Sequence, residues 1–256
     1  MDRFKSLIHI LLLAAAIYLG LLLVCALLQR KLLYFPSHHK ENNGLSEWRA
    51  GGQLIGYARH LPSPETVWLF LHGNGGQATD RIYALPSFSK QDSVYILEYP
   101  GYGIRDGSPS MATINSAAWQ AYDLLREEYP NRPVCVAAES IGSGPASFLA
   151  THPHPPDKIV LILPFDKLSH VAKGHYPVLP VTLLLRDNWD NITTLKGYQG
   201  ELEIFGARAD TIVPISHAKA LADSKPSAVL HTIEGDHNDW AGADKVKIRY
   251  QRQDKK

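Results

Sequence analysis

The sequence has little of several features that define whole classes of protein. Only two of its 256 residues are cysteine, Cys25 and Cys135, which excludes a small fold held together by a network of disulfides. Neither sign of charge is in excess, because 26 basic residues face 25 acidic ones. We therefore expect no nucleic-acid partner. Hydrophobic residues make up 45% of the chain and charged residues 20%, a composition that excludes intrinsic disorder.

The apolar residues are concentrated at the N-terminus. Residues 7–28 carry no charge, and only His9 and Gly20 among them are not apolar. A helix of this length reaches roughly 33 Å, enough to cross a hydrocarbon core of about 30 Å. We expect residues 1–31 to form an uncleaved membrane anchor; a cleaved signal sequence, a lipoprotein signal at Cys25 and a buried core helix are the alternatives. Similar numbers of basic residues flank the run, so the side of the membrane is left open.

The remaining chain alternates between short apolar runs and helical patterns. Residues 32–50 read as a connector, and residues 51–256 as one domain without repeats or a flexible linker. Buried strands are expected at 67–71, 94–97, 134–138, 159–163, 202–205 and 229–233, and helices at 113–129, 142–151 and 215–224. This alternation is typical of an α/β fold with a mostly parallel sheet and helices on both faces. In such sheets, functional residues gather at the carboxyl ends of the strands.

The first unusual strand end carries Ser140. The sequence Ala138-Glu139-Ser140-Ile141-Gly142 places a serine between a strand and a helix, with small residues two positions away on each side. This is the pattern of a nucleophile elbow, in which a tight turn lifts the serine oxygen above the sheet. The first small residue is alanine where glycine is usual. The alternative is an ordinary helix N-cap serine.

The second is the glycine-rich sequence HGNGG at 72–76, directly after an expected strand. Backbone N–H groups in such a loop can point at a developing negative charge, so the amides of Asn74 and Ile141 are candidates for an oxyanion hole. A phosphate-binding loop is the alternative, but neither G-x-x-x-x-G-K-[ST] nor G-x-G-x-x-G occurs here. We expect no cofactor.

The third is a pair of loops that contain Asp210 and His237. A serine hydroxyl needs a base at neutral pH, and the base needs a carboxylate that fixes its tautomer. Ser140, Asp210 and His237 follow one another in the order found in α/β-hydrolases, each at a strand end. This order makes them the candidate catalytic triad.

These motifs together resemble the α/β-hydrolase superfamily over about residues 32–240. The matching segments are LLYFP at 32–36, LHGNG at 71–75, EYPGYG at 98–103, ESIGSG at 139–144, DTIVP at 210–214 and GDHND at 235–239. The chain looks most similar to the small N-terminally anchored serine hydrolases related to serine aminopeptidases and monoacylglycerol lipases. The resemblance implies Ser140 as nucleophile, Asp210 as orienting acid and His237 as base, with an oxyanion hole made by the amides of Asn74 and Ile141. It says little about the substrate.

Other residues could fill these roles. Asp166 follows the expected strand at 159–163, where some hydrolases place the acid. Asp236 and Asp239 are too close in sequence to His237 to reach its ring easily, and His72 and Glu139 read as structural. The pairs His38-His39 and His152-Pro153-His154 lack further ligands at suitable spacing, so we expect no metal.

Residues 164–200 lie where hydrolases of this kind carry a lid. Their apolar part, 177–185, would line an acyl pocket as a functional element or pack on the sheet as a buried helix, and we favour the buried helix. A short lid suits small-molecule, lipid or acyl substrates. After His237 we expect a short polar helix and a solvated basic tail.

The function expected from the sequence is the hydrolysis of ester-type bonds, carboxylester or thioester, by a membrane-anchored serine hydrolase through an acyl-enzyme. A peptidase that acts on short peptides and a catalytically silent scaffold with the hydrolase fold are the alternatives.

Overall fold

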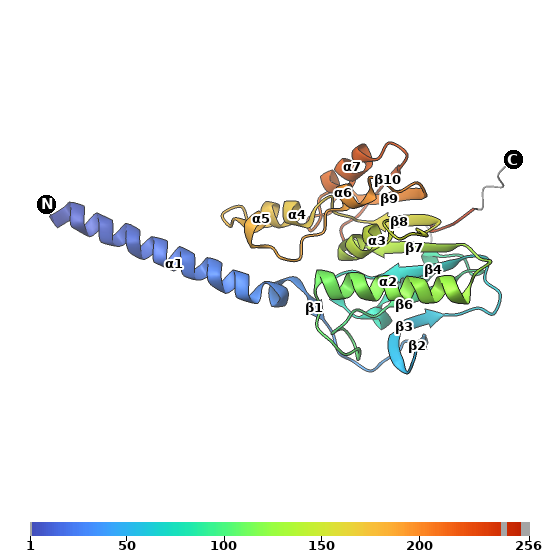
Figure 1. Ribbon diagram of the computed structural model, residues 1–256. Helices are drawn as coiled ribbons and strands as arrows, with labels where there is room; N and C mark the ends of the chain where they lie inside the picture. The colour runs from blue at the N-terminus through green and yellow to red at the C-terminus, as the bar shows by residue number, and fades with distance from the viewer. Residues whose placement is uncertain (1, 242–244, 252–256) are drawn as a thin grey trace.

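The computed structural model describes residues 2–241 and 245–251. Its main sheet has eight strands in the order β10-β9-β8-β7-β4-β6-β3-β2 (Figure 1). The strands are β2 (Ser46–Ala50), β3 (Gln53–Arg59), β4 (Val67–Leu71), β6 (Ser93–Leu97), β7 (Val134–Glu139), β8 (Lys158–Ile162), β9 (Glu201–Ala207) and β10 (Val229–Ile233). β2 and β3 pair antiparallel, as do β3 and β6, and all other neighbours are parallel.

The parallel strands are those that the sequence predicted. β4, β6 and β7 are buried at every residue, because side chains pointing to either face of the sheet are covered. Such strands read as continuous apolar runs, and all six predicted strands are present with ends that differ by no more than two residues. The predicted mostly parallel α/β sheet is confirmed.

The antiparallel edge differs from the sequence reading. β2 lies within residues 32–50, the stretch expected to be a connector, so the sheet begins before residue 51. Gly51 and Gly52 join β2 to β3 with positive φ angles of 56° and 81°, which a two-residue hairpin turn needs and glycine adopts without strain. Adjacent glycines between two short runs are a hairpin signal, and it was present in the sequence.

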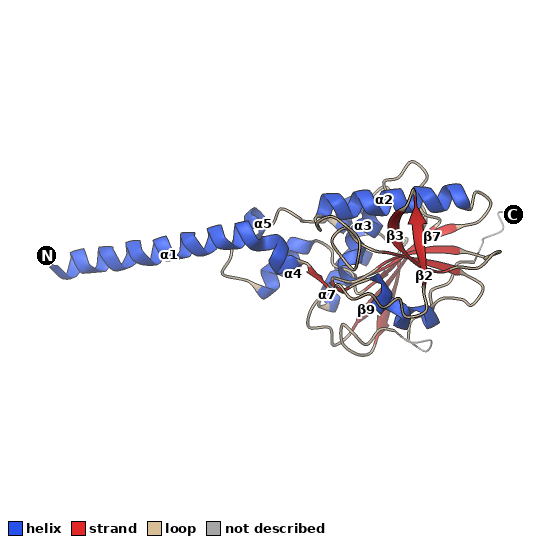
Figure 2. Ribbon diagram, turned by 90° about the horizontal axis from the view of Figure 1, so that it is seen from below, coloured by secondary structure: helices blue, strands red, loops and turns tan. Residues whose placement is uncertain are grey.

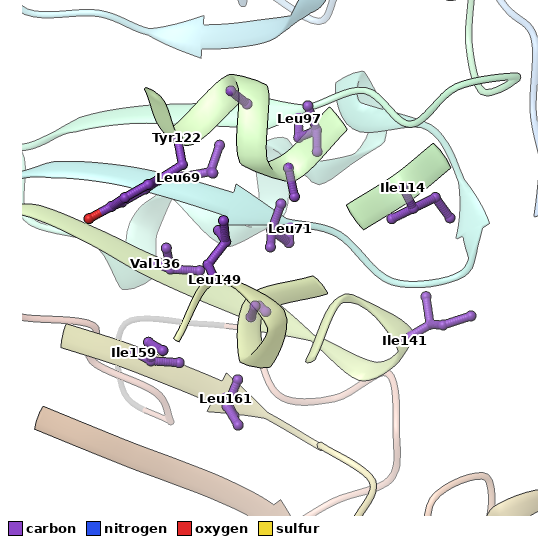
Figure 3. Packing of buried hydrophobic residues seen from close by; sticks show 14 of the residues in the cluster. Leu69, Leu71, Leu97, Ile114, Tyr122, Val136, Ile141, Leu149, Ile159 and Leu161 are labelled. Carbon is purple, nitrogen blue, oxygen red and sulfur yellow. The ribbon is translucent and has the colours of Figure 1, made fainter. Parts of the chain in front are cut away.

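Three α-helices cover one face of the sheet: α2 (Met111–Glu128), α3 (Ser143–Leu149) and α7 (Ile215–Ser224). Figure 3 shows side chains of β4, β7 and β8, among them Leu69, Val136 and Ile159, packed against Tyr122 of α2 and Leu149 of α3. All three helices were expected from the sequence.

The opposite face is covered by the 3-10 helix η1 (Ala78–Ser87) and by the chain after His237. Helices on both faces are therefore confirmed, although the second face carries a 3-10 helix. The expected polar helix and solvated tail are wrong for residues 245–251, because Val246 and Ile248 are fully buried beside Trp240 and Ile248 bridges to Phe88. The rest of the expected tail, 252–256, lies outside the described residues.

The N-terminal helix α1 (Asp2–Leu33) projects away from the sheet (Figures 1 and 2). Its most apolar 18-residue window has no buried residue, and the helix is long and apolar enough to cross a membrane. α1 leads into β1 (Phe35–Pro36), which pairs in parallel with β5 (Gly75–Gly76) in the glycine-rich loop. The chain that leaves α1 therefore pairs directly with the loop expected to hold the oxyanion.

Residues 164–200 contain α4 (Leu168–His175), α5 (Val181–Leu184) and α6 (Asn191–Leu195). The expected buried helix on the sheet is wrong, because α5 lies beside α1 instead and Leu183 is 86% exposed. The physical reason is that α1 offers an apolar helix face outside the domain, and the sequence of the lid alone cannot choose between two apolar surfaces.

Candidate active site

Ser140 lies at a strained turn between β7 and α3. Its φ of 51° is in the left-handed region, which a residue other than glycine rarely adopts, and a strained serine of this kind is typical of a nucleophile elbow. Gly142 makes the turn possible, because a Cβ at this position would lie 2.2 Å from the carbonyl oxygen of Leu71. The carboxyl end of β7 and the start of α3 thus place the serine oxygen at the edge of the sheet.

His237 and Asp210 reach Ser140 from the loops after β10 and β9. His237 Nε2 lies 2.9 Å from Ser140 Oγ, and His237 Nδ1 lies 2.7 Å from Asp210 Oδ2. The other oxygen of Asp210 accepts hydrogen bonds from the backbone N–H groups of Ile212 and Val213, at 2.9 Å and 2.8 Å. Because Nδ1–H donates to the fixed carboxylate, Nε2 is left to accept the serine proton.

The glycine-rich loop lies beside the serine. Asn74 and Ile141 line the same cavity as Ser140, and within the described part of the chain no acceptor occupies the backbone N–H of Asn74. The Asn74 side chain donates to the carbonyl of Leu33, the last residue of α1, and accepts from the Tyr102 hydroxyl at 3.1 Å. The backbone amide that could hold an oxyanion is therefore positioned from both sides.

Comparison with known proteins identifies the fold. No family model matches the chain. The structure superimposes on an esterase of Pyrococcus furiosus with a TM-score of 0.60 and 14% identity, over 80% of this chain and 90% of that one. It also matches the esterase Est1E of Butyrivibrio proteoclasticus with a TM-score of 0.60 and 12% identity, over 75% and 90% of the two chains. The chain has the α/β-hydrolase fold.

Sequence relatives extend the comparison. An uncharacterised protein of Mycobacterium tuberculosis is 28% identical over 233 residues, which cover 82% of this chain and 81% of the relative. Lysophosphatidylserine lipase ABHD12 of Danio rerio is 31% identical over 127 residues, which cover 46% of this chain and 33% of the lipase. The chain thus spans about a third of the lipase's length.

The other candidate acids lie elsewhere. Asp166 binds His217 Nδ1 and His170 Nδ1, each at 2.7 Å. Burial would raise the pKa of Asp166, but the hydrogen bonds from His217, His170 and the backbone of Lys167 lower it to about 2. Asp236 accepts from the backbone N–H of His237 at 2.7 Å, and Asp239 from that of Asp236 at 3.0 Å.

Sequence reasoning assigned Glu139 no more than a structural role, but the structure gives it a central position. Its carboxylate accepts hydrogen bonds from the backbone of Gly73 at 2.8 Å, the Tyr83 hydroxyl at 2.8 Å and the Trp240 indole at 2.9 Å. Arg81 Nε lies 3.4 Å from the same carboxylate. Burial alone would lower the pKa of Arg81, but Glu139, Tyr83 and Asp80 together outweigh burial and raise that pKa. The residue before the nucleophile therefore joins the glycine-rich loop, η1 and the loop of His237.

His72, which the sequence suggested as a structural residue, is fully buried below this region. Its Nδ1 lies 2.7 Å from the carbonyl of Gly73, and its ring packs against Tyr99 at a centroid distance of 4.1 Å. It shapes the start of the glycine-rich loop and does not line the cavity with Ser140.

The cavity above Ser140 has a volume of about 760 Å³, within the range of small-molecule sites. Apolar side chains from the end of α1 and from the lid form much of its wall: Leu32, Leu33, Phe35, Val171, Tyr176 and Leu185. Such a wall suits an acyl chain.

The histidines that were considered as metal ligands have other partners. His39 Nε2 lies 2.6 Å from Asp80, His38 Nδ1 lies 2.9 Å from the carbonyl of Gly103, and His152 Nε2 lies 2.9 Å from Asp123. Among residues 2–241 and 245–251, no group of three or more His, Cys, Asp or Glu side chains could hold a metal ion.

Proposed function

We propose that this chain is a serine hydrolase that is anchored in a membrane by α1 and cleaves carboxylester or thioester bonds of acyl substrates. The observation that carries the proposal is the continuous hydrogen-bonded chain from Ser140 through His237 to Asp210, with distances of 2.9 Å and 2.7 Å. Nucleophile, base and orienting acid lie within the reach that acyl transfer needs.

In the proposed reaction, Ser140 Oγ attacks the carbonyl carbon while His237 Nε2 takes the hydroxyl proton. The carbonyl oxygen becomes an oxyanion held by the backbone N–H groups of Asn74 and Ile141. The tetrahedral intermediate collapses, the bond to the leaving group breaks, and the leaving group takes the proton from His237. Water, activated by the same histidine, then releases the acyl group and regenerates Ser140.

An acyl lipid is the substrate class that the cavity favours. Its wall of apolar side chains from α1 and the lid can hold a hydrocarbon chain, and its position at the base of α1 lies next to the proposed membrane. The relatives named as lysophosphatidylserine lipases support the same class.

The decisive test is the loss of the nucleophile. We expect Ser140→Ala and His237→Ala to lower turnover of short p-nitrophenyl esters by on the order of 10⁴–10⁶, because nucleophile and base act as one unit. A fluorophosphonate probe should label the wild-type chain and leave Ser140→Ala unlabelled. Persistent ester hydrolysis by Ser140→Ala would contradict the mechanism.

Two other outcomes would redirect the assignment. A wild-type chain that neither hydrolyses esters nor reacts with the probe would be a silent scaffold. Probe labelling together with cleavage of short peptides but not of esters would indicate a peptidase.

A further inference from the structure

The lid carries an uncharged segment, residues 176–185, in which several apolar side chains are exposed. Val178 is 77% exposed and Leu183 is 86% exposed. Tyr176 is also exposed, and the sequence YPVLPVTLLL contains no ionisable group except the Tyr176 phenol. Charged residues return at Arg186 and Asp187. We call residues 176–185 the lid tip.

The lid tip is held against the apolar part of α1 by hydrogen bonds. The Tyr18 hydroxyl donates to the carbonyl of Val178 at 2.8 Å. The Gln29 side chain donates to the carbonyl of Leu184 at 3.1 Å and accepts from the backbone N–H of Arg186 at 2.7 Å. The lid tip therefore runs along α1 from the level of Gln29 to that of Tyr18 (Figure 2).

The positions of these contacts show how far the lid tip reaches along the uncharged run of α1. The uncharged run of α1 ends at Leu28, and Tyr18 lies ten residues before it, about 15 Å along the helix. At the other end, Arg30 binds Asp187 at 3.0 Å, so charge reappears in α1 and in the lid at the same level. The lid tip lies beside the uncharged part of α1, and the charged residues Arg30 and Asp187, which follow the two segments, pair with each other.

The backbone of the lid tip is suited to a medium without water. Pro177 and Pro180 have no N–H group, and the N–H groups of Leu179, Val181, Leu183, Leu184 and Leu185 donate within the segment. Two carbonyls accept from Tyr18 and Gln29. Irregular backbone in hydrocarbon is tolerated where its polar groups are satisfied by protein partners.

We propose that the lid tip inserts into the acyl-chain region of the bilayer leaflet next to the catalytic domain, alongside α1. This inference rests on the proposed membrane anchoring of α1. Exposed apolar side chains, the absence of charge and a backbone in which most N–H groups are bonded within the segment all fit lipid chains as the medium around the lid tip.

Insertion gives the substrate a route into the cavity. The cavity wall combines Leu32, Leu33 and Phe35 at the end of α1 with Tyr176 and Leu185 at the two ends of the lid tip. An acyl chain that already lies in the leaflet enters between α1 and the lid without crossing water. The ester group then lies next to Ser140 in the cavity.

Site-specific fluorescence tests the depth of the lid tip in the full chain. An environment-sensitive NBD label is placed at Leu183→Cys, at Leu13→Cys in the middle of α1, or at Gln199→Cys before β9. Each variant carries Cys25→Ala, while Cys135 is fully buried. In phosphatidylcholine vesicles we expect labels at 183 and 13 to be quenched by lipids with spin-labelled acyl chains, and the label at 199 by aqueous iodide.

The three label positions distinguish a failure of the proposed lid insertion from a failure of the proposed membrane anchor. A label at 183 that iodide quenches as strongly as the label at 199, while 13 stays protected, would overturn the insertion of the lid and leave the anchor intact. Iodide quenching at both 13 and 183 would overturn the anchor and the inference together. Hydrolysis of a soluble short ester by the same samples reports the catalytic proposal independently.

A charge in the lid tip tests the substrate route. Leu183 lies outside the cavity wall, so Leu183→Glu should hydrolyse a soluble short ester within about twofold of wild type. We expect its hydrolysis of a long-chain monoacyl ester in vesicles to fall at least about tenfold, because a carboxylate is expelled from hydrocarbon. The matched control is Val229→Glu, at an exposed apolar side chain of β10. Equal activity of both variants on the vesicle substrate would contradict the proposed route.

Discussion

A single carboxylate, that of Glu139, connects the loops that carry the proposed catalytic groups. It accepts from Gly73 in the glycine-rich loop and from Trp240, three residues after His237, and it directly precedes Ser140. Glu139 is 5% exposed, so each of these bonds is shielded from water and holds its loop strongly. The relative positions of Ser140, His237 and the glycine-rich loop therefore depend on this residue.

Replacement of this carboxylate tests its positioning role. Glu139→Gln keeps the size of the side chain but removes the charge that faces Arg81, and we expect kcat for a short ester to fall about 10- to 100-fold with little change in KM. Esterase kinetics measure this, and Glu65→Gln, an exposed glutamate, is the control. If the activity of Glu139→Gln fell only in proportion to the loss of folded protein, with kcat per probe-labelled site unchanged, the positioning role would be contradicted.

At the scale of elements, the lid is joined to the rest of the domain by Asp166. This carboxylate lies between His170 of α4 and His217 of α7 and accepts from both. The two histidines lie in helices that were read separately from the sequence, and no local pattern links them. Their common partner fixes the base of the lid over the sheet.

The lowered pKa of Asp166 predicts a pH-dependent contribution to stability. Its pKa is about 2 in the folded chain against an ordinary value of 3.8, so the ionised form stabilises the fold above about pH 4. We expect Asp166→Asn to lower the free energy of unfolding by about 2 kcal/mol at pH 7.

That difference should shrink as the pH falls from about 4 to 2, where the wild-type carboxyl also becomes protonated. Denaturant titration of the detergent-solubilised chain at several pH values measures it, with the exposed Asp223→Asn as control. A difference that stays constant down to pH 2 would contradict this role for Asp166.

At the scale of the whole molecule, α1 is packed against the domain by specific contacts. Tyr18, Gln29 and Arg30 reach the lid, and the carbonyl of Leu33 accepts from Asn74 in the glycine-rich loop. The proposed anchor and the proposed active site are therefore parts of one packed unit.

Removal of the α1 side chains that hold the lid should loosen it. In the double variant Tyr18→Phe, Gln29→Leu, three hydrogen bonds to the lid are lost, each contributing about 0.5–1.5 kcal/mol. We expect limited proteolysis of the detergent-solubilised chain within residues 176–187 to become on the order of tenfold faster. Leu13→Ala, in the same helix but away from the lid, is the control, and equal cleavage rates in both variants would contradict the prediction.

The positions of the parallel strands, the helices between them and the candidate triad were all readable from the sequence. Buried parallel strands appear as continuous apolar runs, and the residues at their carboxyl ends meet at one edge of the sheet, so Ser140, Asp210 and His237 could be grouped before any coordinates. The β2–β3 hairpin was missed, although Gly51-Gly52 signalled it, because polar residues interrupt the apolar pattern of its strands.

By itself the sequence determined the α/β sheet, the strand ends that carry the candidate catalytic residues and a helix long enough to cross a membrane. Only the tertiary structure decided that Glu139 joins three loops, that Asp166 binds two histidines and that the lid packs on α1 instead of the sheet. Strands and elbows are encoded by residues close together in the chain. The packing of the lid on α1 brings together residues 160 positions apart in the chain. The sequence of an apolar segment does not indicate which apolar surface it will pack against.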